Sequence, residues 1–145
     1  ALALAPQRSD TLKLLADALQ KQGRRAEEIE MLDRAQQEVE TRHLAPIAGL
    51  NFQRGEALLS LQRVAEAEQS FRKETTNFPG NRQAWGSLAL VVGAQGRRDE
   101  ARQILLSATS QNRDDRMLKI ALECFEIMSD PAGADLVRKQ MRGAA

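Results

Sequence analysis

Apolar residues recur along the chain at spacings of three and four, the period of a helix with one buried face. The clearest run consists of Trp85, Leu88, Ala89 and Val92. After a short polar break, a second run with helical spacing consists of Ala101, Ile104, Leu105 and Ala108. This pattern predicts two amphipathic helices joined by a tight turn.

The residues of the polar break fit the turn. Gly96 follows the first apolar run, where a residue in the left-handed conformation commonly ends a helix. Asp99 and Glu100 come next, and acidic side chains favour the amino end of a helix through its dipole. The unit is therefore predicted to be helix, turn, helix.

The turn motif occurs three times. Residues 23–28 read Gly-Arg-Arg-Ala-Glu-Glu, residues 62–67 read Gln-Arg-Val-Ala-Glu-Ala, and residues 96–101 read Gly-Arg-Arg-Asp-Glu-Ala. The first interval is longer than the second, which is explained by five inserted residues within 41–46, where Pro46 interrupts the helical pattern. The second interval, from Gln62 to Gly96, is the regular one. A period of about 34 residues indicates a helical repeat protein.

These residues resemble the tetratricopeptide repeat. The third unit fills eight positions of the family pattern, namely Trp85, Leu88, Ala89, Val92, Gly96, Ala101, Leu105 and Ala108. The second unit fills five, namely Gly55, Leu58, Ala67, Phe71 and Pro79. Three residues depart from the pattern: Glu28 stands where a small Ala is usual, Arg54 replaces a Leu, and Arg113 replaces the closing Pro. Looser packing is expected around Glu28.

The resemblance implies an all-α fold, a right-handed superhelix of antiparallel helix-turn-helix hairpins. The expected parts of this single domain are the end of a truncated upstream repeat at 1–8 and four repeats at 9–47, 48–81, 82–114 and 115–145. The last includes a short closing helix over 131–142. Its register fits best if one residue is missing from the connection 111–115.

Composition narrows the partner class. Hydrophobic residues make up 42% of the chain and charged residues 28%, which is typical of a soluble globular protein. The net charge is only +1, and the aromatics are four Phe and one Trp. The small net charge and the few aromatic side chains both argue against nucleic acid as the binding partner. A basic edge is conceivable, but acidic residues interrupt it; its members are Arg97, Arg98, Arg102, Arg113 and Arg116. No apolar run is long enough to span a membrane.

No catalytic constellation, cofactor motif or metal-ligand spacing appears, so we expect no enzyme activity and no cofactor. His43 is the only histidine and lies in the inserted connection. A pair with Cys124 is conceivable, but Cys124 adjoins an apolar stripe and is better interpreted as a buried structural thiol.

In the tetratricopeptide family the first helix of each pair lines a concave groove that receives a peptide or partner helix. By register, the expected lining residues are Lys13, Asp17, Gln20, Phe52, Gln53, Glu56, Leu59, Gln83, Ser87, Leu90, Arg116, Lys119 and Glu123. Stacking does not require Phe52, Leu59 and Leu90, which either pack beneath a neighbouring helix or bind an apolar segment. The family's carboxylate clamp is not matched, because Asp17, Gln83 and Ser87 replace its polar and basic residues.

Three functional hypotheses follow. The first is a protein-interaction scaffold that holds a peptide or helix in the groove. The second is a repeat appendage of a larger bacterial enzyme, such as a hydrolase. The third is self-association through the end exposed by the cut first repeat.

Overall fold

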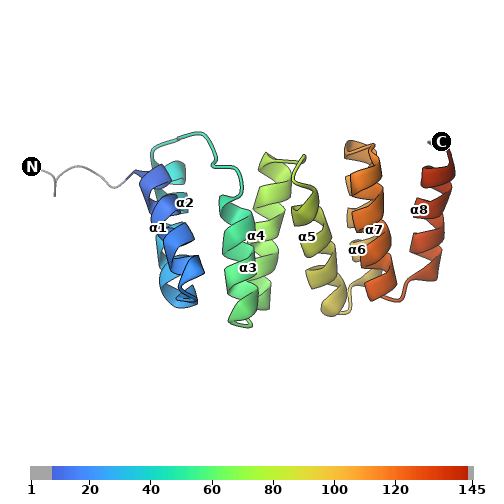
Figure 1. Cartoon of the computed structure of the whole chain (residues 1–145), viewed down its shortest axis with the longest axis horizontal. Helices are drawn as coiled ribbons and strands as arrows, with labels where there is room; N and C mark the ends of the chain where they lie inside the picture. The colour runs from blue at the N-terminus through green and yellow to red at the C-terminus, as the bar shows by residue number, and fades with distance from the viewer. Residues whose placement is uncertain (1–7, 144–145) are drawn as a thin grey trace, which may run out of the picture. The chain divides into compact units, whose positions relative to one another are not determined.

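The computed structural model describes residues 8–143, so nearly all of the predicted upstream remnant at 1–8 lies outside the described residues. Every regular element within 8–143 is an α-helix, and consecutive helices pack as antiparallel hairpins (Figure 1). The predicted all-α fold is confirmed. The chain divides into two compact units, Ala1–Lys73 and Glu74–Ala145.

The first unit contains α1 (Ser9–Lys21), α2 (Arg25–Thr41), α3 (Leu50–Ser60) and most of α4 (Val64–Asn77). Helix α1 packs against α2, and α2 packs against α3. The connection between α2 and α3 is longer than the turns within the hairpins, as Pro46 and the preceding residues predicted.

The second unit begins within the last turn of α4 and contains α5 (Arg82–Ala94), α6 (Arg98–Gln111), α7 (Asp115–Ile127) and α8 (Pro131–Gly143). Helices α5 and α6 form one hairpin, and α7 and α8 form the next. Helix α7 contacts both α5 and α6, so the two hairpins stack. Helix α8 occupies the place of the predicted closing helix.

The four hairpin turns share one geometry. Gly23, Gln62, Gly96 and Ser129 all have positive φ, between 54° and 88°. In each turn the next amide donates to a carbonyl five positions back, as Arg63 N does to Leu58 O at 2.9 Å. This bond closes a Schellman motif, which satisfies carbonyls at the helix end. The step from Gly96 to Ser129 is one position shorter than the step from Gln62 to Gly96.

The core of the first unit lies where α1, α2 and α3 meet. Its buried members include Leu12, Ala16, Leu32, Ala35 and Leu50. Next to it, Gly55 of α3 faces Phe71 of α4 so closely that a Cβ atom there would lie 2.6 Å from the Phe71 ring. The small residue at 55 therefore sets how near the two helices approach.

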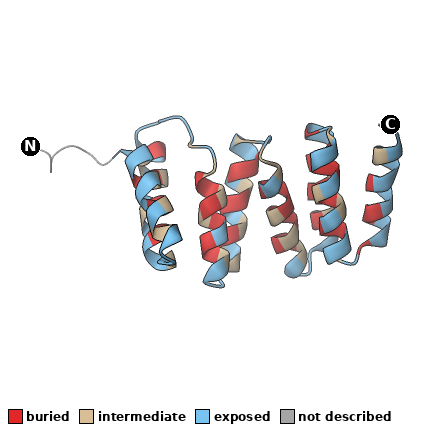
Figure 2. Ribbon diagram, viewed as in Figure 1, coloured by how far each residue is buried: buried red, intermediate tan, exposed pale blue. Residues whose placement is uncertain are grey.

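The core of the second unit follows the predicted apolar stripes (Figure 2). Ala89, Val92, Ala101, Leu105 and Ala108 are each 0% exposed. Trp85 is buried as well, and its indole Nε1 donates to the carbonyl of Pro79 at 2.8 Å. The apolar positions of the family pattern therefore serve as core residues.

Two leucines of α1 are exposed. Leu15 lies 43% exposed, and its neighbour Leu14 lies 68% exposed. Among the described residues, the helices that pack on α1 cover it from one side only. Its apolar stripe is wider than the surface that they cover. None of the helices within residues 8–143 is long and apolar enough to cross a membrane.

Candidate partner-binding surfaces

On α1, two of the three predicted lining residues, Lys13 and Asp17, pair with each other. The ammonium group of Lys13 lies 2.8 Å from the carboxylate of Asp17, one helical turn further on. Both residues are half-buried, as is Gln20. An ion pair at this spacing contributes only about 0.3 to 0.5 kcal/mol, so either partner remains accessible to a competing charge.

On α3, two predicted lining residues contact neighbouring helices of the first unit, and one of them is buried. Gln53 is only 6% exposed, and its amide donates to Glu28 at 2.9 Å. The ring of Phe52 lies 5.9 Å from that of Phe71, with the planes tilted by 55°. Phe52 was expected either to pack beneath a neighbouring helix or to bind an apolar segment, and its contact with Phe71 is of the first kind. The other two, Leu59 and Glu56, are half-buried and exposed respectively.

Glu28, where the family pattern has a small residue, is fully buried. One carboxylate oxygen lies 3.1 Å from the guanidinium of Arg25, and the other accepts the bond from Gln53. The loose packing expected here is therefore replaced by a polar contact between α2 and α3. Partial burial raises the pKa of the nearby Glu56, the positive charge of Arg25 opposes that rise, and the negative charge of Glu28 adds to it.

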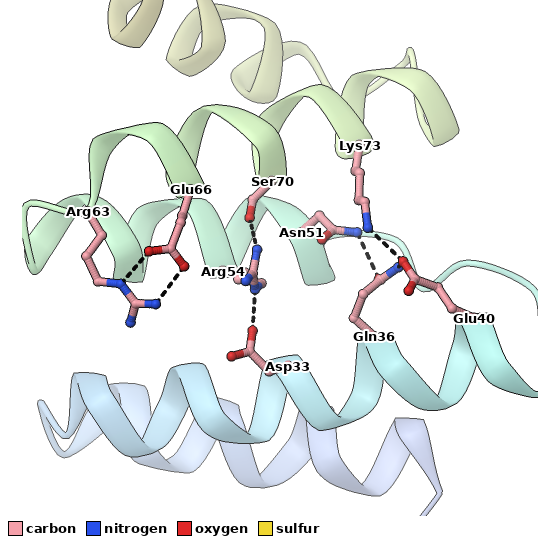
Figure 3. Close-up of polar contacts among 9 residues, drawn as sticks. All are labelled: Asp33, Gln36, Glu40, Asn51, Arg54, Arg63, Glu66, Ser70 and Lys73. Carbon is pink, nitrogen blue, oxygen red and sulfur yellow. Dashed lines mark hydrogen bonds and ion pairs between the residues drawn. The ribbon is translucent and has the colours of Figure 1, made fainter.

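Helices α2, α3 and α4 share a polar network that sequence reasoning missed (Figure 3). Arg54 of α3 donates to Asp33 of α2 and to the Ser70 hydroxyl of α4, each at 2.5 Å. Lys73 of α4 lies 2.7 Å from Glu40 of α2. The substitution of Arg for the family's Leu at 54 was the available signal, because a cation beside two helices requires polar partners.

In the second unit, the predicted lining residues remain at the surface. Gln83 of α5 is exposed, Ser87 is half-buried, and three residues of α7 are exposed: Arg116, Lys119 and Glu123. These three are spaced by three and four residues, so they lie on one face of α7. That face carries charges of both signs.

Leu90 contributes to a pocket of about 460 Å³ at the turn end of the third hairpin. The wall consists of Leu90, Gly93, Ala94, Arg98, Ile127 and Met128, contributed by α5, α6 and the carboxyl end of α7. Ile127 is 68% exposed, the same fraction as Leu14. An exposed apolar side chain beside a mostly apolar hollow is a feature of ligand-binding surfaces.

A second cavity, of about 430 Å³, lies between α6, α7 and the end of α8. Its lining is mixed, with Leu106 and Leu118 beside Arg113, Asp115 and Gln140. Since cation and anion stand together at its rim, it favours no charge class of ligand.

The two candidate chemical groups differ in exposure, because Cys124 is buried and His43 is exposed. Cys124 is 4% exposed, and burial, assisted by the negative charge of Glu123, raises the pKa of its thiol to about 11. A thiol with this pKa is a poor nucleophile near neutral pH. His43 is exposed in the connection between α2 and α3. No group of three or more metal-ligating side chains occurs among the described residues.

Three arginines of the predicted basic edge, Arg97, Arg98 and Arg102, are engaged locally. Arg102 forms two hydrogen bonds with Asp130, at 2.7 and 2.8 Å, and Arg97 pairs with Glu100 at 3.2 Å. Arg98 donates to the carbonyls of Met128 and Ser129. These contacts neutralise part of the edge, in keeping with the interleaved acidic residues.

No family model matches the sequence, and no curated protein matches it either. Solved structures do match. MamA superposes with a TM-score of 0.71 at 18% identity, over 96% of this chain and 79% of its own; MamA AMB-1 gives 0.67 at 18%, over 93% and 72%. PilF of Pseudomonas aeruginosa gives 0.66 at 18%, over 99% of this chain and 64% of its own. MamA and PilF are tetratricopeptide repeat proteins, so the chain has the fold of that class.

Proposed function

We propose that this chain is a protein-interaction scaffold that binds a peptide or partner helix along the first helices of its hairpins. The fold likeness to MamA, over 96% of the chain, carries the proposal. It is supported by the second unit, where α5 and α7 are in contact and keep hydrophilic side chains at their surface. A repeat built this way offers a broad face for a partner.

The test uses peptides selected from a displayed random library on the intact chain. Arg116→Glu with Lys119→Glu reverses two exposed charges on the proposed face of α7. Lys139→Glu with Arg142→Glu makes the same charge change on α8 and serves as the control, because both residues are exposed there. We expect selected peptides to bind the α7 variant at least about tenfold more weakly, or about 1.4 kcal/mol, and the control nearly as tightly as the parent.

An equal loss in both variants, or a larger loss in the α8 variant, places binding elsewhere and contradicts the proposal. Phe52 is a poor position for this test, since its contact with Phe71 means that a charged substitution disturbs folding as well as binding. Circular dichroism of all variants is compared first, so that a lost helix is not mistaken for a lost contact.

Two further hypotheses stay predictions. A repeat appendage of a larger enzyme, such as a hydrolase, is tested by the natural full-length sequence. Self-association through the first hairpin is tested by the mass of the parent and of Leu14→Glu at rising concentration, because Leu14 is the most exposed leucine of α1.

A further inference from the structure

The pocket beside Leu90 has two small residues in its wall. Gly93 and Ala94 belong to the last turn of α5, and Met128 at the carboxyl end of α7 lines the same pocket. A Cβ atom on Gly93 would lie 2.7 Å from the sulfur of Met128, so the Met128 thioether lies directly against the glycine. The pocket wall is therefore apolar and adaptable, since methionine side chains adjust readily to irregular contacts.

The same positions are filled with polar side chains in the first hairpin. When the turn glycines Gly23 and Gly96 are aligned, Leu90 corresponds to Asp17, Gly93 to Gln20 and Ala94 to Lys21. Asp17 is held there by Lys13 at 2.8 Å. The equivalent positions of the first hairpin therefore carry polar side chains, so the apolar wall of this pocket is not common to every hairpin.

The rim of the pocket carries a positive charge. Arg98 opens α6, and its Nη2 group donates to the carbonyls of Met128 and Ser129 at the carboxyl end of α7. These two acceptors are uncharged, in contrast to the carboxylates that Arg97 and Arg102 contact. The guanidinium is exposed, so an anion can approach it from solvent.

We infer that the pocket formed by Leu90, Gly93, Ala94, Ile127 and Met128 binds one aliphatic or aromatic side chain of a partner peptide whose neighbouring carboxylate lies against Arg98. The inference rests on the proposed function and names the chemistry of the partner. A hollow of about 460 Å³ is within the usual range for small-ligand sites and admits a leucine- or phenylalanine-sized group. The rim cation gives the site a preference for acidic sequence context.

The first experiment titrates the ¹⁵N-labelled full chain with N-acetyl-leucine, which has both the apolar side chain and the carboxylate. We expect amide shifts at Gly93, Ala94 and Met128, with saturation in the range of about 1 to 10 mM expected for so small a ligand. N-acetyl-leucine amide, which lacks the charge, is expected to bind about twofold to fivefold more weakly. N-acetyl-glutamine has the charge but no apolar side chain, and it should leave these amides unshifted.

The second experiment fills the pocket. Ala94→Trp places a large ring in the hollow from an exposed helix end and should abolish the shifts caused by N-acetyl-leucine. Lys21→Trp is the matched control, because Lys21 holds the equivalent position of the first hairpin and is also exposed. It should leave the titration unchanged.

The proposed pocket is contradicted if the amide shifts caused by N-acetyl-leucine map elsewhere. It is also contradicted if Ala94→Trp binds N-acetyl-leucine as the parent does. Equal affinity for the acid and the amide overturns the role of Arg98. This outcome can be distinguished from that of the scaffold proposal. Selected peptides that bind the parent and Ala94→Trp equally support the scaffold and contradict the proposed pocket. Conversely, N-acetyl-leucine binding without any selectable peptide supports the pocket and contradicts the scaffold.

Discussion

At the scale of single residues, the departures from the family pattern are the informative positions. Glu28 stands where the family pattern has a small residue. Its buried carboxylate is accommodated because Arg25 and Gln53 each bind one of its oxygens. A buried carboxylate is tolerated only with such partners. The sequence showed the unusual residue but not the partner, since Gln53 is distant in the chain and reaches Glu28 only through the packing of α3 on α2.

We expect Glu28→Ala to lower the free energy of unfolding by about 1 to 3 kcal/mol, because the buried Gln53 amide loses its acceptor. Adding Gln53→Leu should recover part of this loss by removing the stranded polar group. Urea unfolding of the single and double variants measures both effects. A double variant that is no more stable than Glu28→Ala contradicts this account.

The turn residue Gln62 is under backbone strain. Its φ of 61° belongs to the left-handed region, where Gly23 and Gly96 stand in the equivalent turns. We expect Gln62→Gly to raise the free energy of unfolding by about 0.5 to 1 kcal/mol, because glycine adopts this conformation without the Cβ clash. Gln22→Gly is the matched control: Gln22 has a φ of −87°, so the change there should destabilise. Thermal unfolding of both variants gives the comparison.

At the scale of elements, the sequence predicted the helices and their turns because both signals are local. The apolar period of each helix and the turn motif at 23, 62 and 96 are contained in short windows. The fourth turn, at Ser129, has no glycine, and only its distance along the chain from Gly96 relates it to the others. The network of Arg54, Asp33 and Ser70 was not predictable, since it depends on how three helices meet.

Close approach of α3 and α4 depends on Gly55. We expect Gly55→Ala to destabilise the chain by about 1 to 3 kcal/mol, because the added methyl group overlaps the buried Phe71 ring. Gly80→Ala is the control, since a Cβ atom there meets nothing within 4 Å. Phe71→Leu in the Gly55→Ala background tests the mechanism, and the two changes together should cost less than their sum. Denaturant unfolding measures all of these chains.

At the scale of the whole molecule, the described helices fall into two compact units, and each stabilises its hairpins differently. The first relies on the buried Glu28 and the network around Arg54. The second uses helix caps: Asp114 accepts from the Met117 amide at 2.9 Å and Asp130 from the Gly133 amide at 3.1 Å, while Arg82 and Arg102 bind the same carboxylates. Each of these carboxylates thereby caps the start of a helix, Asp114 that of α7 and Asp130 that of α8, while binding an arginine of an earlier helix.

These caps predict acid sensitivity. Hydrogen bonds from Arg82 and from the Met117 amide hold the pKa of Asp114 below its ordinary value of 3.8, and Arg102 does the same for the pKa of Asp130. Because the folded-state pKa is depressed, the stabilisation is complete above the unfolded value and is lost as pH falls through the folded one. We expect Asp114→Asn to unfold at a lower temperature than the parent at pH 7. Asparagine still caps the helix, so the difference in melting temperature, called the gap here, should close in acid below pH 3.8. Melting curves across pH measure the gap, and a gap that is constant with pH argues against a charge effect.

The connection that joins α2 to α3 offers a place to separate the chain by design. Residues 42–46 are exposed and follow the end of α2, so a protease site inserted there should leave every helix intact. After cleavage, the α1–α2 hairpin is held to α3 by non-covalent contacts alone. Mixing the purified fragments then turns helix stacking into a bimolecular association, whose dissociation constant reports directly how strongly one hairpin stabilises its neighbour.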